Sequence, residues 1–424
     1  MAPFPRGARP SGPASAKATP TLSAQVAAPI AAHAAGLASP IASAPNAGLH
    51  GHIFAGLVKS PSRTGSPALV VPSASPTPSV ETVVSLATDG ALADYICQSP
   101  LLASCNITPE EVKSHIMQWR KLGVQLASQL GFEHDDMDDI QRLRVYHYYL
   151  PVFFWVEKQL AAHRTSGAKH ALVVGISAPQ GCGKTTLVEQ LEALYTATGR
   201  TAASVSIDDF YLTYQDQTAL GQAHPGNPLL QYRGNAGSHD LKLGTDTLKQ
   251  LRELTQPGQQ LAVPRYNKSA YAGRGDRADP SAWPSVPGPV DVVLFEGWMS
   301  GFEPVSDEQV ASVDPNLVPV NQALRAYKAA WDDWVDAWLV VRIGDPQWVF
   351  KWRLQAEERM RASGKAGMTD AQIADFVARF MPAYKAYLPG LYAKGPTTAR
   401  AGKTLIIEVD EKRSPVVHQP APVL

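Results

Sequence analysis

Nine residues, 178–186, have the types and spacing of a phosphate-binding loop. They are Ala178, Pro179, Gln180, Gly181, Cys182, Gly183, Lys184, Thr185 and Thr186. This is the P-loop pattern with alanine at the first glycine position, and its small residues let backbone N–H groups close around phosphate oxygens. We expect Lys184 to reach the β- and γ-phosphates of a nucleotide and Thr185 to bind Mg²⁺, while the helix that begins at Lys184 adds the positive end of its dipole.

The flanking residues favour a nucleotide site over an ordinary glycine-rich turn. An apolar run precedes the loop, and Leu187, Leu191 and Leu194 follow it at helical spacing. The P-loop is expected between a strand and a helix, so both neighbours agree with the pattern. Cys182 is interpreted as a small loop residue rather than a nucleophile.

Acidic residues follow two later apolar runs. Asp208 and Asp209 come 24 and 25 residues after Lys184, and Glu296 ends the run 292–295. A phosphoryl acceptor needs a carboxylate that takes the proton of its hydroxyl, and the pair at 208–209 is placed for that role. A single acid after a strand suits a ligand of Mg²⁺ or water. The plainer alternatives are solvated loop acids for the pair and a helix cap or ion-pair partner for Glu296.

Other nucleotide-dependent classes fit the sequence less well. A GTPase would carry Asn-Lys-x-Asp, and the nearest string, 267–270, lacks the aspartate. Motor and AAA-type ATPases usually have two adjacent acids where Glu296 stands alone. The pattern therefore favours a small-molecule kinase.

Five apolar runs must position these residues. They span 171–177, 203–207, 291–296, 338–343 and 404–409, and they are nearly continuous rather than alternating. Strands of that kind are buried on both faces, which predicts an α/β fold with a doubly wound parallel sheet. Ligands of such folds bind at the carboxyl ends of the strands, where the loop and the acids would meet.

Residues 81–168 predict a helical N-terminal subdomain before a kinase domain at 169–424. Thr108, Pro109 and Glu111 form a helix start with a capping box, and this helix should end near Gly131. A second helical stretch, from about 138 to 163, should be kinked or broken by Pro151. We assign its aromatic residues, and the thiols of Cys97 and Cys105, to packing; a regulatory pairing of these two cysteines stays open.

Residues 1–80 predict an organelle transit peptide or disordered leader. They contain no Asp or Glu, five basic residues, 19 Ala, 13 Pro and 11 Ser. The alternative is a disordered tail without a targeting role. Since the whole chain has 38 basic and 38 acidic residues, residues 81–424 are net acidic, which argues against nucleic-acid binding. No apolar run approaches the ~20 residues that cross a membrane.

Several motifs together resemble a known family. Asp208-Asp209-Phe210-Tyr211 and Glu296-Gly297-Trp298 resemble the phosphoribulokinase/uridine kinase/pantothenate kinase group of P-loop kinases. The strings 175–186, 232–240 and 263–269, with 300–302 and 352–357, resemble plant-type D-glycerate 3-kinases within it. The resemblance covers roughly residues 90–415. It implies that ATP, with Mg²⁺, phosphorylates the 3-hydroxyl of D-glycerate in the chloroplast stroma, in the closing step of photorespiration.

The resemblance also implies roles for individual residues. Asp208 becomes the catalytic base, assisted by Lys184, and Asp209 a ligand of Mg²⁺ or of the substrate, beside Thr185 and Glu296. Tyr211 and Asp240 lie in the segments expected to close over the acceptor, and Asp240 is preferred to its neighbour His239.

An acceptor with a carboxylate needs a fixed cation. Arg265, Lys268, Arg274 and Arg277 fall within 13 residues, and we rank Arg265 and Lys268 first. Arg353 lies on a predicted helix that would act as a lid, although i,i+4 pairing with Glu357 explains it equally well. The function alternatives that stay open are a related kinase with a nucleoside or sugar-phosphate acceptor and a non-catalytic nucleotide-binding regulator.

Overall fold

The computed structural model describes residues 88–362, 364 and 368–416. All of them belong to the second of the chain's two units, residues 54–424. The predicted leader at 1–80 lies outside the described residues. Among the described helices, none is long and apolar enough to span a membrane.

A five-stranded parallel sheet forms the centre of the fold. Its order is β2 (Ala202–Ser206), β7 (Val292–Gly297), β1 (Leu172–Ser177), β8 (Ala337–Ile343) and β9 (Thr404–Val409). All four strand pairs are parallel. The five predicted runs are thus confirmed as strands, and so is the doubly wound α/β fold. Because β1 and β7 are central, the segments that follow them emerge side by side.

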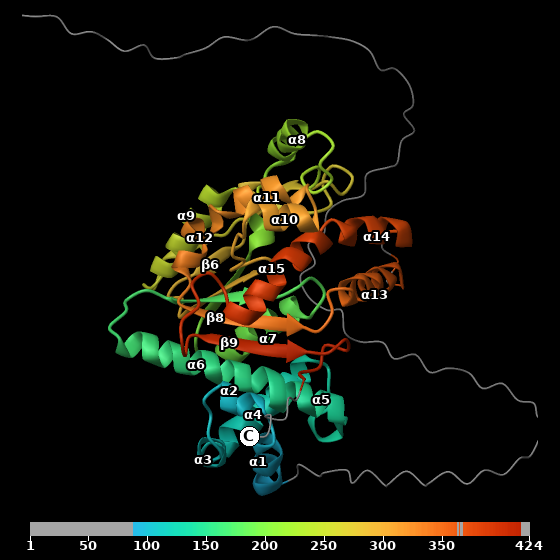
Figure 1. The fold of residues 1–424 in the computed structure, drawn as a ribbon. Coiled ribbons are helices and arrows are strands. Elements are labelled where there is room, and N and C mark those ends of the chain that lie inside the picture. Colours follow the sequence, from blue (N-terminus) through green and yellow to red (C-terminus); the bar gives the residue numbers. More distant parts are fainter. Residues whose placement is uncertain (1–87, 363, 365–367, 417–424) are drawn as a thin grey trace, which may run out of the picture. The chain divides into compact units, whose positions relative to one another are not determined.

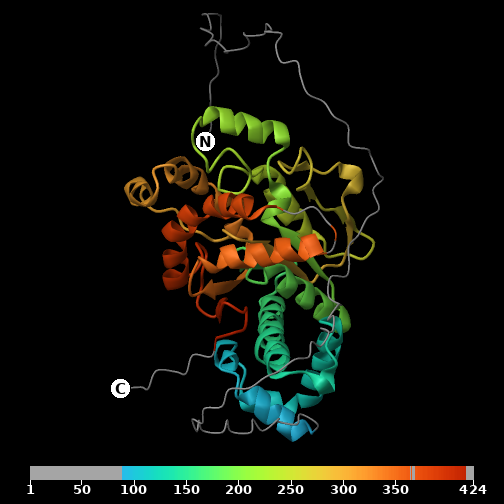
Figure 2. The same cartoon turned by 90° about the vertical axis from the view of Figure 1, so that its right-hand side faces the viewer.

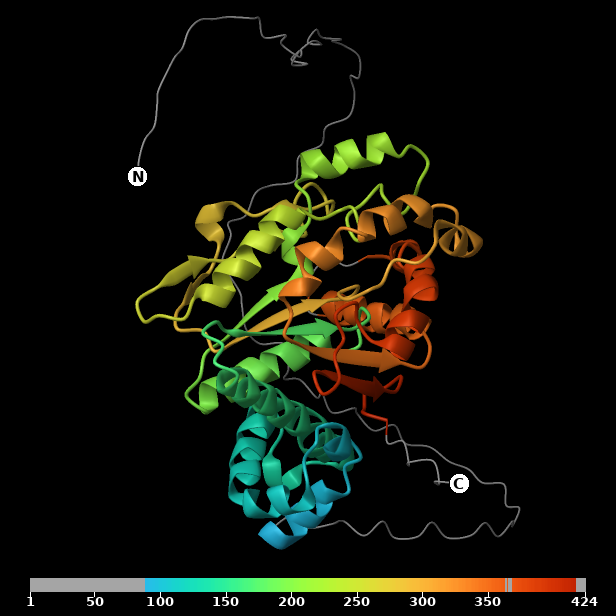
Figure 3. The ribbon, with the colours of Figure 1, turned by 60° about the vertical axis from the view of Figure 1, so that its left-hand side comes forward.

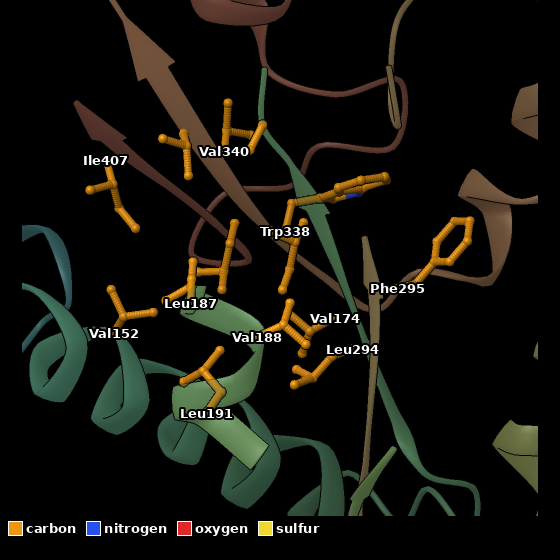
Figure 4. Packing of buried hydrophobic residues seen from close by; sticks show 14 of the residues in the cluster. Val152, Val174, Leu187, Val188, Leu191, Leu294, Phe295, Trp338, Val340 and Ile407 are labelled. Carbon is orange, nitrogen blue, oxygen red and sulfur yellow. The ribbon is translucent and has the colours of Figure 1, made fainter. Parts of the chain in front are cut away.

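Helices cover both faces of the sheet. On one side lie α6 (Leu150–Thr165) and α7 (Lys184–Ala197), and on the other α9 (Leu241–Glu253) and α15 (Met381–Lys394) (Figure 1). Figure 4 shows Val188 of α7 beside Val174 and Leu294 of the sheet, with Leu187 and Leu191 on the same helix. These side chains are at most 5 % exposed, so α7 is fixed against β1 and holds the loop before it in place.

The helices that precede β1 lie together on the α7 side of the sheet (Figure 2). They are α1 (Asp89–Cys97), α2 (Leu101–Ser104), α3 (Pro109–Ser114), α4 (Ile116–Gln129) and α5 (Asp139–Arg144). Their buried side chains join those of the sheet in one continuous core. The predicted aromatic packing is confirmed at Tyr146, Phe153 and Trp155, each at most 3 % exposed.

The first predicted helix is divided in two. The capping box of Thr108 and Glu111 forms as expected. His115 leaves helical geometry at φ −115° and ψ 20°, so α3 ends there and α4 begins. The ring Nδ1 of His115 lies 2.9 Å from the Glu111 carbonyl oxygen. The same carbonyl also accepts the His115 backbone N–H at 3.2 Å, so the break lies in the backbone geometry of His115 and not in a lost hydrogen bond at this residue.

Pro151 neither ends the second helix nor starts a new loop. A π-helical turn, Val145–Tyr149, links α5 to α6, and Leu150 donates its N–H to the carbonyl of Val145, five residues back. Pro151 then occupies the first turn of α6, where its missing N–H costs nothing. The helix therefore continues past Pro151, which directly follows the π-helical turn.

Two small antiparallel hairpins between α9 and β7 were not expected. They pair β3 (Gln260–Ala262) with β6 (Ser285–Pro287) and β4 (Tyr266–Asn267) with β5 (Asp276–Arg277). Figure 3 shows these yellow segments next to α9. The remaining helices are α8 (Tyr214–Ala223), α10 (Asp307–Val313), α11 (Leu317–Leu324), α12 (Tyr327–Ala330), α13 (Trp348–Ala362) and α14 (Asp370–Ala378).

The three cysteines are free thiols. Cys105 and Cys182 are buried, and burial raises the pKa of Cys182 to about 11. This places Cys182 among packed loop residues, in agreement with its interpretation as a loop filler.

Candidate active site

The P-loop follows β1 and is held by contacts from distant parts of the chain. Gly181 and Gly183 have left-handed backbones, with φ of 80° and 99°. The Gln180 N–H donates to the Tyr384 hydroxyl on α15 at 3.1 Å. Arg413, after β9, donates its Nε to the Gly181 carbonyl at 2.6 Å. A Cβ on Gly181 would lie 2.7 Å from Cβ of Trp352 on α13. The loop is therefore fixed on three sides before any nucleotide binds.

Lys184 and Glu296 form an ion pair across the ends of β1 and β7. Lys184 Nζ lies 2.6 Å from Glu296 Oε2, and the two side chains are 16 % and 13 % exposed. Burial alone would lower the pKa of Lys184, but Glu296 and Asp208 outweigh it and raise that pKa. The lysine is thus charged and directed to the carboxyl edge of the sheet. Glu296 is thus an ion-pair partner in this structure, the role that its place in the sequence left open as the alternative to a ligand of Mg²⁺ or water.

Asp208 lies between two lysines. It belongs to a 3₁₀ turn, Ile207–Phe210, directly after β2, and its Oδ2 is 2.5 Å from Lys268 Nζ. Burial opposes ionisation, but Lys268 and Lys184 outweigh it and hold the pKa of Asp208 well below its usual range. The carboxylate therefore stays ionised beside the P-loop lysine.

Asp209 faces a different environment from its neighbour. Its Oδ2 accepts the Ser206 N–H at 3.3 Å and an Nη1 hydrogen of Arg265 at 3.4 Å. Burial, together with the charge of Asp208, raises the pKa of Asp209 despite Arg265. The two adjacent acids are therefore distinct in charge environment, and Asp209 also caps the turn that carries Asp208.

The hairpin β4–β5 brings Lys268 and Arg265 to the acids. Arg233 anchors this hairpin from the preceding segment, because its guanidinium donates to the carbonyls of Lys268, Gly273 and Arg274 at 3.3, 2.8 and 2.5 Å. Lys268 itself is 57 % exposed on its side chain. The hairpin backbone is thus held firmly while the ammonium group at its tip can move.

Tyr211 and Asp240 lie at opposite sides of a short bridge between two loops. Tyr211 is 4 % exposed, stacks on the ring of His239 with centroids 4.6 Å apart, and hydrogen-bonds to Asp208. Asp240 caps α9 through the Leu243 N–H at 2.9 Å, and its other oxygen pairs with Arg277 at 2.9 Å. Both Asp240 oxygens are therefore engaged in holding the fold.

Arg353 lies on α13 with its charge already paired. It contacts Glu357, which is 1 % exposed and also accepts the Met368 N–H at 2.8 Å. The Arg353 guanidinium lies 4.9 Å from the centre of the Phe376 ring on α14. The predicted i,i+4 pair is present; its glutamate is buried, whereas the Arg353 side chain is 36 % exposed.

Alternating rings and guanidinium groups run from the hairpin to α13. The members in order are Tyr271, Tyr214, Arg274, Tyr232, Arg379, Phe376 and Arg353. The first two rings stack with centroids 4.0 Å apart. Each guanidinium lies 4.4–5.5 Å from the centre of a neighbouring ring, within the range of cation–π contacts.

Four residues that hold this site were not singled out from the sequence. They are Arg233, Trp352, Tyr384 and Arg413. Arg233 and Trp352 stand in strings that carried the family resemblance, whereas Tyr384 and Arg413 follow no motif. Their contacts join segments up to 232 residues apart in the chain, so no local spacing could reveal them.

The oxygen ligands at this edge of the sheet fit a Mg²⁺–nucleotide complex. Thr185 is exposed on the first turn of α7, directly after Lys184, and the carboxylates of Glu296 and Asp208 lie close to Lys184. Mg²⁺ bound to a nucleotide takes one or two protein ligands, with phosphate and water completing the shell, so a closed protein cage is not required.

Another group of potential metal ligands is less suitable. In the part of the chain that the structure describes, His163, His170 and Asp336 lie close enough to share an ion. They stand at the amino ends of β1 and β8. Arg252 already contacts both His170 and Asp336 there, and its positive charge disfavours a cation.

Comparisons with known proteins agree with this geometry. Residues 173–316 match the model of the Phosphoribulokinase / Uridine kinase family. The chloroplastic D-glycerate 3-kinase of Arabidopsis thaliana is 51 % identical over 330 residues, which cover 77 % of this chain and 72 % of that protein. An uncharacterized kinase of Schizosaccharomyces pombe is 34 % identical over 255 residues, 58 % of this chain and 90 % of that protein. The solved structure of a D-glycerate 3-kinase from Cryptococcus neoformans is 37 % identical, with a TM-score of 0.58, and the match covers 63 % of this chain and 97 % of that one.

Proposed function

The chain belongs to the family of P-loop kinases that contains D-glycerate 3-kinase, and from this premise we propose that it transfers the γ-phosphate of ATP to the 3-hydroxyl of D-glycerate. The product is 3-phosphoglycerate, as in photorespiration. The identity to the Arabidopsis enzyme supports the acceptor. The observation that carries the chemistry is the ionised Asp208 carboxylate between the P-loop lysine and Lys268 of the hairpin.

Nucleotide binding would exchange one partner of Lys184. The loop 178–186 would wrap the phosphates through the backbone N–H groups that remain free, and the charge of Lys184 would move from Glu296 to the β- and γ-phosphates. Glu296 is then released beside Thr185 and Asp209, where these oxygens would hold Mg²⁺. The ion supplies charge neutralisation at the transferring phosphate.

Asp208 would accept the proton of the 3-hydroxyl. Its carboxylate remains ionised at neutral pH, so it can hydrogen-bond to the hydroxyl and direct the oxygen at the γ-phosphate. A depressed pKa makes it a weak base, which suits a loose transition state in which the proton leaves late. Tyr211, hydrogen-bonded to Asp208, fixes the orientation of that carboxylate.

The acceptor carboxylate would be bound by Lys268 and Arg265. Lys268 is exposed enough to transfer its charge from Asp208 to an arriving anion, which would free Asp208 for the hydroxyl. Arg265 stands on the other side, next to Asp209. Asp240 would act through Arg277 and α9 rather than by direct contact.

A phosphate role for Arg353 would require a new partner for its guanidinium. The group must leave Glu357 to reach a γ-phosphate. Because Glu357 is also bound to the Met368 N–H, the carboxylate would keep one partner after the arginine departs. This arrangement supports a lid role for the Arg353 side chain, which would turn to the phosphate while the backbone of α13 stays against the P-loop.

We further propose residues 1–80 as a transit peptide, residues 81–168 as a helical subdomain and residues 169–424 as the kinase domain. The Arabidopsis relative is described as chloroplastic, which supports delivery to the chloroplast, where the stroma is the proposed compartment. Fusion of residues 1–80 to a fluorescent protein should deliver it to plastids. A cytosolic signal would contradict the targeting proposal.

A substrate panel tests the proposed reaction. Purified protein is given ATP and Mg²⁺ with D-glycerate, other hydroxy acids, nucleosides and sugar phosphates, and ADP release is measured. D-Glycerate should be the preferred acceptor, and Lys184→Ala should abolish turnover of all acceptors because the phosphates lose their cation. Preference for a nucleoside or sugar phosphate would overturn the acceptor, and ATP binding without turnover of any of them would favour a regulator.

A further inference from the structure

His239 presents a buried hydrogen-bond donor next to the reacting carboxylate. The residue is 5 % exposed. Its backbone is fixed opposite Tyr211, since Leu212 donates to the Ser238 carbonyl at 3.0 Å and Asp240 to that of Phe210 at 2.7 Å. The imidazole is therefore carried by the same short bridge that follows Asp208.

Three aromatic rings hold the imidazole in one orientation. Tyr211 stacks on it, and Tyr327 and Trp331 contact it edge to face with centroids 5.6 and 5.4 Å away. The ring atom Nδ1 of His239 also lies 2.7 Å from the hydroxyl oxygen of Tyr327. A ring packed on this many sides cannot rotate to find another partner.

The proton of His239 can be assigned from these contacts. The Tyr327 oxygen accepts the Gly237 N–H at 2.9 Å, and we assign the contact with Nδ1 as donation of the Tyr327 hydroxyl proton to that nitrogen. Burial lowers the pKa of His239 to about 3, so the ring is neutral at physiological pH. We therefore place the single ring proton on Nε2, which makes Nε2 a donor.

Nε2 is buried, and among the residues that the structure describes none forms a hydrogen bond with it. A buried donor without a partner destabilises the folded state, so an unpaired donor kept beside a reacting group needs a reason. Asp208 is the charged group that acts on this ring. The ring is also linked to Asp208 by contact, because Tyr211 stacks on it and hydrogen-bonds to Asp208.

We propose that His239 Nε2–H donates a hydrogen bond to the 2-hydroxyl of the acceptor, and that His239 is therefore a specificity-determining residue. This rests on the proposed function. D-Glycerate has three polar groups: the 3-hydroxyl faces Asp208, the carboxylate needs the cations of Lys268 and Arg265, and the 2-hydroxyl remains. A neutral donor suits a neutral hydroxyl, and a site that expects such a group discriminates against acceptors that lack it.

The test uses the full-length protein and three variants. His239→Phe keeps the ring stack but removes the donor, and His239→Gln offers an amide N–H instead. His147→Phe is the matched control, because His147 is also buried, at 8 % exposure, but lies on the π-helical turn before α6. Each protein is assayed with D-glycerate and with 3-hydroxypropanoate, which lacks the 2-hydroxyl.

His239→Phe should lower kcat/KM for D-glycerate about 10- to 100-fold, the range for one unpaired hydrogen bond. The KM for ATP should stay unchanged, and His239→Gln should recover part of the loss. With 3-hydroxypropanoate the wild type and His239→Phe should agree within about twofold.

Two results would overturn the inference. One is wild-type kcat/KM for D-glycerate in His239→Phe, and the other is an equal loss with both acceptors, which marks a packing role. Failure of the proposed function looks different, because the wild type itself would then not phosphorylate D-glycerate.

Discussion

Alanine at Gly181 should destabilise the protein more than alanine at Gly183, although both residues lie in the P-loop. Gly181 and Gly183 have φ of 80° and 99°, so alanine at either position pays about 1–2 kcal/mol for a left-handed backbone. At Gly183 the new methyl meets nothing within 4 Å. At Gly181 it lies 2.7 Å from Cβ of Trp352, which is attached directly to the backbone of α13 and cannot swing aside.

The difference between the two variants measures the contact with α13. Forcing an extra methyl into a packed site costs typically about 1–3 kcal/mol. The total is therefore about 1–2 kcal/mol for Gly183→Ala and about 2–5 kcal/mol for Gly181→Ala. The loop would relax in the free protein to escape part of this cost, and ATP binding would then have to restore it, which weakens the affinity for ATP.

Urea unfolding of the nucleotide-free protein provides the measurement. The free energy of unfolding is compared for wild type, Gly183→Ala and Gly181→Ala, so that contacts with bound phosphate do not enter. ATP affinity is then measured for the same proteins. If Gly181→Ala is as stable as Gly183→Ala, the loop is not packed against Trp352 in solution and the argument for a loop fixed before nucleotide binding fails.

Three further predictions concern charged groups. Asp208→Asn should lower kcat by about 10²–10⁴-fold with ATP affinity retained. Asp209→Asn keeps an oxygen for the Ser206 N–H but loses a charged ligand for Mg²⁺, so it should lower kcat less and be partly rescued by raised Mg²⁺; a larger loss of kcat in Asp209→Asn than in Asp208→Asn would reverse their roles. Arg353→Ala should lower kcat without raising the KM for glycerate, and an unchanged kcat would leave Arg353 a partner of Glu357 alone. Burial raises the pKa of Asp332 to about 7, so the folded state binds this proton more tightly and Asp332 contributes a free energy of unfolding that falls from pH 4 to 7, opposite in sign to the buried neutral His239. The stability difference between wild type and Asp332→Asn should therefore fall over this range, and parallel curves for the two proteins would refute the assignment.

The sequence predicts the sheet well because its strands are buried on both faces. A continuous apolar run such as 338–343 must be buried on both faces, and the interior of a parallel sheet provides that environment. The acids at 208–209 and at 296 follow such runs directly, so their arrival at the same sheet edge as Lys184 follows from the parallel topology. The P-loop could be predicted in the same way, because it directly follows the first of these apolar runs.

Contacts between distant segments could not be predicted in this way. Lys268 sits on a hairpin of two-residue strands that no periodicity marks, and its contact with Asp208 spans 60 residues. The donor that we assign to His239 could not be predicted either, because the assignment rests on the contact of Nδ1 with Tyr327, which lies 88 residues later in the chain. The end of α3 at His115 is likewise a local change of backbone geometry that the spacing of apolar residues does not reveal.

Because Arg413 holds the P-loop, the loop can reach its final shape only after Arg413 has been synthesised. The loop leaves the ribosome early, but the guanidinium that binds the Gly181 carbonyl follows 232 residues later. At about 5–20 residues per second, that delay is roughly 10–50 seconds. A nascent chain therefore carries the loop long before it can hold the loop in its final shape. Premature termination a dozen residues before the end of the chain would release a protein with all five strands but an unfinished nucleotide site.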